Sequence, residues 1–171
     1  MARFVDTLIQ DGLESPIDVI VDPDEGDLID ARHRRLRHHW WAALRARERL
    51  PGRDDFPFGF LAEIDDFVMI VAKAGADLRY ETYGKAIARA YGRDMTGRFV
   101  CEFPSIVSQL FSSVYRTCMS QQVPVFTRHK PPPTVRVAYW LRLIVPLGEA
   151  GPGEVTHFLV CNVPLGEAVP L

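Results

Sequence analysis

Hydrophobic positions recur with a helical period in two segments of the chain. In residues 30–50, apolar side chains such as Trp40 share one face of a wheel with about 100° per residue, and arginines occupy the other faces. Asp30 is a suitable N-cap, and the Pro-Gly pair at 51–52 ends the pattern. Residues 104–122 open with a proline and carry a wider apolar arc. We therefore predict two long helices, the second covered on more than one side.

Shorter apolar or alternating runs predict five strands. Two of them, over residues 67–72 and 78–83, are separated by a turn and form a hairpin. A short helix follows, and Gly92 is placed to end it in a left-handed conformation. The three remaining strands are predicted over residues 124–129, 135–145 and 154–163. Five strands, with a long helix between the second and the third, predict an α+β domain with an antiparallel sheet.

Composition places the chain among ordinary globular proteins. Its 171 residues are 47% hydrophobic and 25% charged, so one domain with a core that needs no disulfides is expected. The longest purely apolar run, at 67–72, is far shorter than the ~20 residues of a membrane span. The start of the chain lacks the apolar region of a signal peptide, so we expect a cytoplasmic protein without membrane partners.

Charge is unevenly divided between two neighbouring segments. Residues 1–29 carry eight acidic residues against one arginine, and residues 31–53 carry eight arginines against one glutamate. Either the two segments attract each other, or both are solvated surface. We expect residues 1–29 to form an acidic extension that includes at most a short strand, before a domain over 30–165 and a tail over 166–171.

Three stretches of sequence carry a resemblance to a known family. They are Leu78-Arg-Tyr-Glu-Thr-Tyr-Gly-Lys-Ala-Ile87, Tyr91-Gly-Arg-Asp-Met-Thr-Gly-Arg98 and Tyr139-Trp-Leu-Arg-Leu-Ile-Val-Pro-Leu147. With the predicted order of elements, they resemble a bacterial stand-alone PAS subfamily over residues 30–163. The resemblance implies a PAS-like fold, which is a five-stranded antiparallel sheet with a crossover long helix and a flanking helix at residues 30–50.

The resemblance also implies a function. PAS domains of this kind are non-catalytic sensory or adaptor modules that bind other proteins, and some hold a small ligand in the cup between the long helix and the sheet. Because no output module follows the strands, an unidentified signalling partner would act in trans. The expected lining of the cup is Tyr83, Tyr91, Phe111, Tyr115, Met119 and Trp140.

No pattern for a cofactor, a metal or a catalytic group is found. Cys101 lies near a Gly-Arg-Phe segment like that of flavin-binding PAS domains, but no asparagine precedes it. Residues 104–122 contain no histidine that could be an axial haem ligand. His33, His38 and His39 lack the i, i+4 spacing of a helical zinc site. We therefore expect a colourless protein without enzymatic activity.

Two other functions stay open. A small α+β enzyme could use the same cup, and it would need a buried ionisable residue that faces the cup. A nucleic-acid accessory protein could use the arginine-rich helix at residues 30–50, although the net charge of −2 gives no bulk electrostatic reason for such binding.

Self-association is expected through the first long helix. Leu36 and Trp40 lie in its apolar stripe, whereas Trp41 lies outside the stripe among arginines. Tryptophan beside arginine is typical of interface anchors, so we expect a homodimer through Leu36, Trp40 and Trp41. The alternative is that Trp41 packs against residues 1–29 of its own chain.

Overall fold

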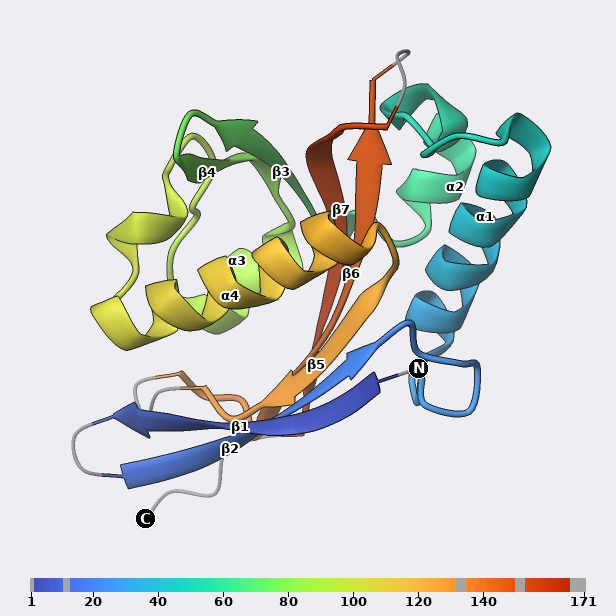
Figure 1. Ribbon diagram of the computed structural model, residues 1–171. Helices are drawn as coiled ribbons and strands as arrows, with labels where there is room; N and C mark the ends of the chain where they lie inside the picture. The colour runs from blue at the N-terminus through green and yellow to red at the C-terminus, as the bar shows by residue number, and fades with distance from the viewer. Residues whose placement is uncertain (1, 11–12, 132–134, 150–152, 167–171) are drawn as a thin grey trace.

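The protein is an α+β structure built on a single antiparallel sheet of seven strands, as seen in a computed structural model that describes residues 2–10, 13–131, 135–149 and 153–166 (Figure 1). The strand order across the sheet is β1-β2-β5-β6-β7-β3-β4. The strands are β1 (Ala2–Gln10), β2 (Leu13–Val21), β3 (Val68–Ala74), β4 (Asp77–Tyr83), β5 (Val125–His129), β6 (Tyr139–Gly148) and β7 (Val155–Leu165). The helices are α1 (Ala31–Arg47), α2 (Phe58–Ala62), α3 (Lys85–Tyr91) and α4 (Ser105–Gln121).

The sheet is larger than the five strands that the sequence predicted. Strands β1 and β2 form an antiparallel hairpin, and β2 pairs with β5 from Asp18 opposite Arg128 to Val21 opposite Val125. Strands β1 and β2 therefore extend the sheet, where the sequence suggested an extension with at most a short strand. Strand β6 begins at Tyr139, later than predicted, because the backbone N–H of Val137 bonds to the carbonyl of Val135 in a tight turn.

Helices α1 and α4 cover opposite faces of the sheet. On β5, the Phe126 ring lies 5.6 Å from the His33 ring of α1, whereas the His129 ring lies 5.8 Å from the Phe111 ring of α4. Residues three apart on a strand point to opposite faces, so the two helices are separated by the sheet. Figure 1 shows α4 running across the strands.

The glycine-containing turn after α3 fastens α3 to strand β4. Gly92 ends α3 with a φ of 87°, and its N–H bonds to the carbonyl of Ala88, which confirms the predicted left-handed cap. Gly97, with a φ of 78°, donates to the Tyr80 carbonyl at 2.7 Å. These bonds, with that from the Tyr80 N–H to the Arg98 carbonyl, hold the chain before α4 against β4.

The apolar arc of α4 is buried, as its period predicted. Leu110, Phe111, Val114 and Tyr115 are buried, and Met119 is half-buried. We expect Leu110→Ala to lower the free energy of unfolding by about 2–5 kcal/mol, because the cavity it leaves adds to the lost burial. Urea denaturation measures this loss, with exposed Ser113→Ala as the control. A loss below about 1 kcal/mol would contradict the placement of α4.

Candidate functional site: the cup between α4 and the sheet

Aromatic rings fill much of the space between α4 and the sheet, which we call the cup. They contact each other as a chain, from Tyr91 to Phe103 at 5.4 Å and from Phe103 to Phe111 at 5.6 Å. Tyr83 joins this chain through Tyr80, whose ring lies 6.0 Å from that of Phe103. Three of the residues predicted to line the cup, Tyr83, Tyr91 and Phe111, therefore belong to one cluster.

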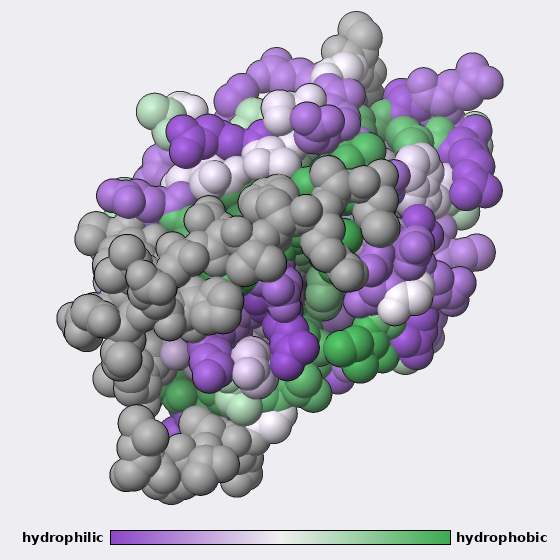
Figure 2. All heavy atoms as spheres, turned by 60° about the horizontal axis from the view of Figure 1, so that its bottom comes forward, coloured by the Kyte–Doolittle hydropathy of each residue, from purple (hydrophilic) through white to green (hydrophobic). Residues whose placement is uncertain are grey.

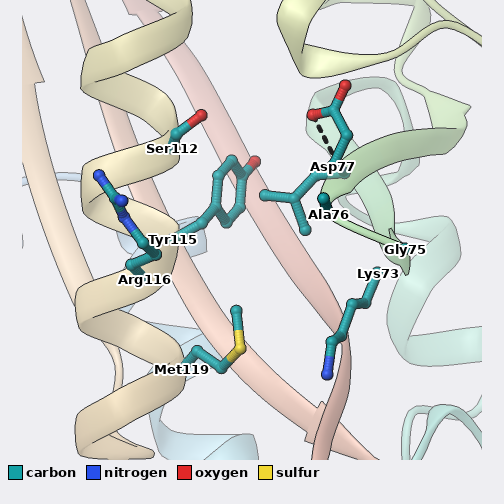
Figure 3. Close-up of a pocket in the computed structure, with 9 residues that line it drawn as sticks. Lys73, Gly75, Ala76, Asp77, Ser112, Tyr115, Arg116 and Met119 are labelled. Carbon is teal, nitrogen blue, oxygen red and sulfur yellow. Dashed lines mark hydrogen bonds between the residues drawn. The ribbon is translucent and has the colours of Figure 1, made fainter.

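A cavity of about 150 Å³ opens between α4 and the β3–β4 hairpin. Figure 3 shows Tyr115 and Met119 projecting into it from α4, with Lys73 on the opposite side. These two α4 residues are a further part of the predicted lining. Trp140, the last of the predicted set, is buried opposite His129 in the register of β5 and β6, away from this cavity.

Polar residues on three neighbouring strands, β5, β6 and β7, lie buried in the cup. Arg142 on β6 is 4% exposed, and its direct cross-strand partner Asn162 on β7 is 2% exposed. His129 on β5 is 5% exposed. The guanidinium carbon of Arg142 lies 3.9 Å from the centre of the Phe111 ring, which places the charge under α4.

Sequence reasoning missed this polar cluster. The available signal was Arg142 itself. It is the only charged residue in the segment that begins at Tyr139 and ends at Gly148. Every second residue of a strand shares a face, so Arg142 shares its face with Trp140 and Ile144. Both of these neighbours are buried, and so is the arginine.

The buried polar groups lack partners within the described part of the chain. Arg142 Nε and Nη1, His129 Nδ1 and Asn162 Oδ1 have no hydrogen-bond partner there. No described carboxylate forms an ion pair with Arg142. A buried charge without a counter-charge or hydrogen bonds is costly, so these atoms are the groups of the cup that water or another molecule would have to satisfy.

Arg142 carries the charge of the cup at neutral pH. Burial and, to a smaller extent, the charge of Arg142 lower the pKa of His129 to about 3. Burial raises the pKa of Tyr115 to about 12, against an opposing effect of Arg142. The imidazole and the phenol are therefore uncharged at pH 7, and the buried guanidinium stays positive.

The arginines of α1 are largely engaged by their own chain. Arg32 pairs with Asp30 at 2.8 Å, Arg47 pairs with Asp55 at 2.9 Å, and Arg35 pairs with Glu63. The guanidinium groups of two more arginines bond to backbone carbonyls in the acidic segment, namely Arg34 to Leu28 and Arg37 to Pro23. The basic helix and the acidic segment thus make contact, although through backbone atoms of the latter.

Two of the three residues expected at the dimer surface of α1 are buried within their own chain, so the prediction is wrong for these two. Leu36 and Trp40 are 0% exposed, because the stripe packs on β6 and β7 and Trp40 Nε1 donates to the Pro146 carbonyl at 2.8 Å. Trp41 is half-buried, and its ring lies 5.0 Å from that of Trp40. On the face drawn in Figure 2, hydrophobic residues form patches between hydrophilic ones. A homodimer stays a prediction, now with Trp41 as its one accessible anchor.

Neither a metal centre nor a membrane helix is found in the described ranges. No group of three or more histidine, cysteine, aspartate or glutamate residues among them could hold a metal ion. No helix in the same ranges is long and apolar enough to cross a membrane. Comparisons of the chain with known families, curated proteins and solved structures found no significant match.

Proposed function

We propose that this chain is a PAS-like, non-catalytic sensory or adaptor protein of the cytoplasm, whose affinity for a partner protein changes when a small ligand occupies the cup. The observation that carries the proposal is the strand order. Strands β4-β3-β7-β6-β5 follow each other across the sheet, and α4, which crosses them, lies between the second and the third in sequence. This supports the five-stranded antiparallel sheet with a crossover long helix that the resemblance to PAS domains implies.

The second support is the content of the cup. It combines an aromatic wall with the buried and unpartnered groups of Arg142, His129 and Asn162. A ligand that satisfies these groups would stabilise one arrangement of α4 relative to the sheet. Such a ligand shifts a binding equilibrium only by its differential affinity for the two arrangements.

A small α+β enzyme is the second candidate, and one observation favours it. His129 and Arg142 are buried ionisable residues that face the cup, which is what that alternative requires. Against it, a general base works best when its pKa is near the working pH, and the pKa of His129 is about 3. The described residues also offer His129 Nδ1 no carboxylate to orient it.

The experiment compares the partners of three versions of the protein, each purified from its host after chemical crosslinking and quantified by mass spectrometry. Met119→Trp fills the cavity beside α4, and Ser113→Trp puts the same side chain on the exposed face of α4 as the matched control. We expect at least one crosslinked protein to change in amount with Met119→Trp and to stay unchanged with Ser113→Trp.

Two results would contradict the proposal. One is an identical set of crosslinked proteins in all three versions. The other is time-dependent conversion of a metabolite when the purified chain is incubated in catalytic amounts with an extract of its host, which would favour the enzyme.

A further inference from the structure

We infer that the cup binds a small organic carboxylate, whose anionic group pairs with the buried guanidinium of Arg142. The inference rests on the proposed function, because it names the chemical class of the ligand for the same cup. It starts from a positive charge that the fold buries and leaves without a counter-charge among the described residues. Taking a charge out of water is unfavourable by several kcal/mol unless a partner compensates it.

The unpartnered donors of Arg142 favour an anionic acceptor. Nε and Nη1 of Arg142 are two donors without an acceptor, and a carboxylate oxygen is a charged acceptor to which either of them can donate. The cross-strand neighbour Asn162 offers an amide oxygen that has no donor, which suits a hydroxyl or amino group on the same ligand.

The charge of the buried part of the cup favours a singly charged ligand. There Arg142 supplies the positive charge, and burial keeps His129 neutral because its pKa is about 3. A phosphate group would bring about 1.5 to 2 negative charges at neutral pH. The cup would then hold more negative charge than the Arg142 guanidinium can compensate.

The surroundings favour a compact ligand with an apolar body. Phe111, Tyr115 and Met119 are spaced four residues apart on α4 and therefore lie on one face of the helix. Phe111 covers Arg142, whereas Tyr115 and Met119, the next two residues of this face, line the cavity, so the row of three side chains leads from the cavity to the charge. Arg142 itself does not line the cavity. A cavity of about 150 Å³ has the size that accommodates benzene in a protein core.

The lining of this cavity carries two positively charged residues and one negatively charged residue. Lys73 and Arg116 line it together with one acidic residue, Asp77 (Figure 3). Lys73 also pairs with Glu154 at 2.6 Å. Arg116 is exposed and has no ion-pair partner among the described residues, so it can attract an approaching anion.

The test uses three small carboxylates and their uncharged amides: propionate with propionamide, isobutyrate with isobutyramide, and benzoate with benzamide. Thermal unfolding of the purified protein is followed at millimolar ligand and at one ionic strength set with sodium chloride. We expect at least one carboxylate to raise Tm by about 3 °C more than its amide, since a ligand that binds the folded state raises Tm.

Variants separate the guanidinium from general salt effects. Arg142→Met is expected to lose the carboxylate response, while its own Tm without ligand is at least that of the wild type, because a buried unpaired charge is removed. Arg128→Met is the matched control. Arg128 lies on β5 and points to the other face, where its guanidinium carbon is 4.4 Å from the centre of the Tyr139 ring. This control should keep the full response.

The inference is overturned if no carboxylate shifts Tm more than its amide does in the wild type, or if Arg142→Met responds as the wild type does. Should Arg142→Met fail to fold, the carboxylate–amide pairs on the wild type decide alone. These outcomes leave the comparison of crosslinked partners in place, so a failure of the ligand class is distinguishable from a failure of the proposed function.

Discussion

Acidification from about pH 6.5 to pH 4 is expected to destabilise the protein strongly, through two buried histidines. Burial lowers the pKa of His33 to about 4 and that of His129 to about 3. An unfolded histidine has a pKa of about 6.5, so between these values the unfolded state binds more protons than the folded state. Stability is therefore present above pH 6.5 and is lost as the pH falls, by about 1.4 kcal/mol per histidine and pH unit.

The charges around each histidine agree with this direction. His33 Nε2 lies 3.2 Å from the Cys161 carbonyl oxygen, and the attraction of Asp30 for the protonated form does not offset the effect of burial on the pKa of His33. At His129, burial and the positive charge of Arg142 both lower the pKa. Over two pH units, the two histidines together lower the free energy of unfolding by roughly 5 kcal/mol. This loss is at the lower end of the total stability of about 5–15 kcal/mol that is typical of a domain.

Urea denaturation at several pH values measures this loss. His33→Gln and His129→Gln should each flatten the dependence of unfolding free energy on pH between about 6.5 and 4, because each removes one titrating group. His38→Gln, at an exposed position of α1, should leave it unchanged. Equal slopes in the wild type and in both buried-site variants would contradict the assignment.

Gly84→Ala is expected to destabilise the fold by about 3 kcal/mol. A Cβ atom at this position would overlap the Asp66 carbonyl oxygen, and it would lie 2.7 Å from the Asp66 carbonyl carbon and 3.0 Å from the Val68 nitrogen. All three atoms are backbone, so relief requires the start of α3 to move away from the start of β3. The backbone at Gly84 has an ordinary φ of −56°, and the effect is therefore one of space alone.

Gly59→Ala is the matched control for that substitution. Gly59 lies in α2, and a Cβ atom there would meet nothing within 4 Å. Because alanine is the better helix former, this change should stabilise the protein by about 0.5–1 kcal/mol. Thermal and urea unfolding measure both variants, and a Gly84→Ala protein as stable as Gly59→Ala would contradict the close packing at the start of α3.

The sequence predicted the elements whose signals are local. Helix α4 and the hairpin of β3 and β4 follow directly from the spacing of apolar residues, and the left-handed Gly92 follows from its place after α3. The pairing of β2 with β5 was not predicted, because Val21 and its partner Val125 are about a hundred residues apart. No local pattern shows such a pairing.

The aromatic half of the cup was predicted, and its polar half was not. Tyr115 and Met119 could be placed from the helical period of α4. Arg142 and His129 lie on strands, and a strand pattern alone does not show which of its two faces is covered. The burial of Leu36 and Trp40 was missed for a similar reason. The apolar stripe of a helix can pack on the sheet of its own chain or on a second chain, and the sequence pattern is the same in both cases.

A crystal structure of the protein purified from its own host is the most direct test of ligand binding in the cup. We predict a small non-protein molecule between α4 and the sheet, with its anionic group against the Arg142 guanidinium and its body among the aromatic rings. A cup filled by side chains alone, with the Arg142 nitrogens bonded to water or to a carboxylate of the chain itself, would contradict it.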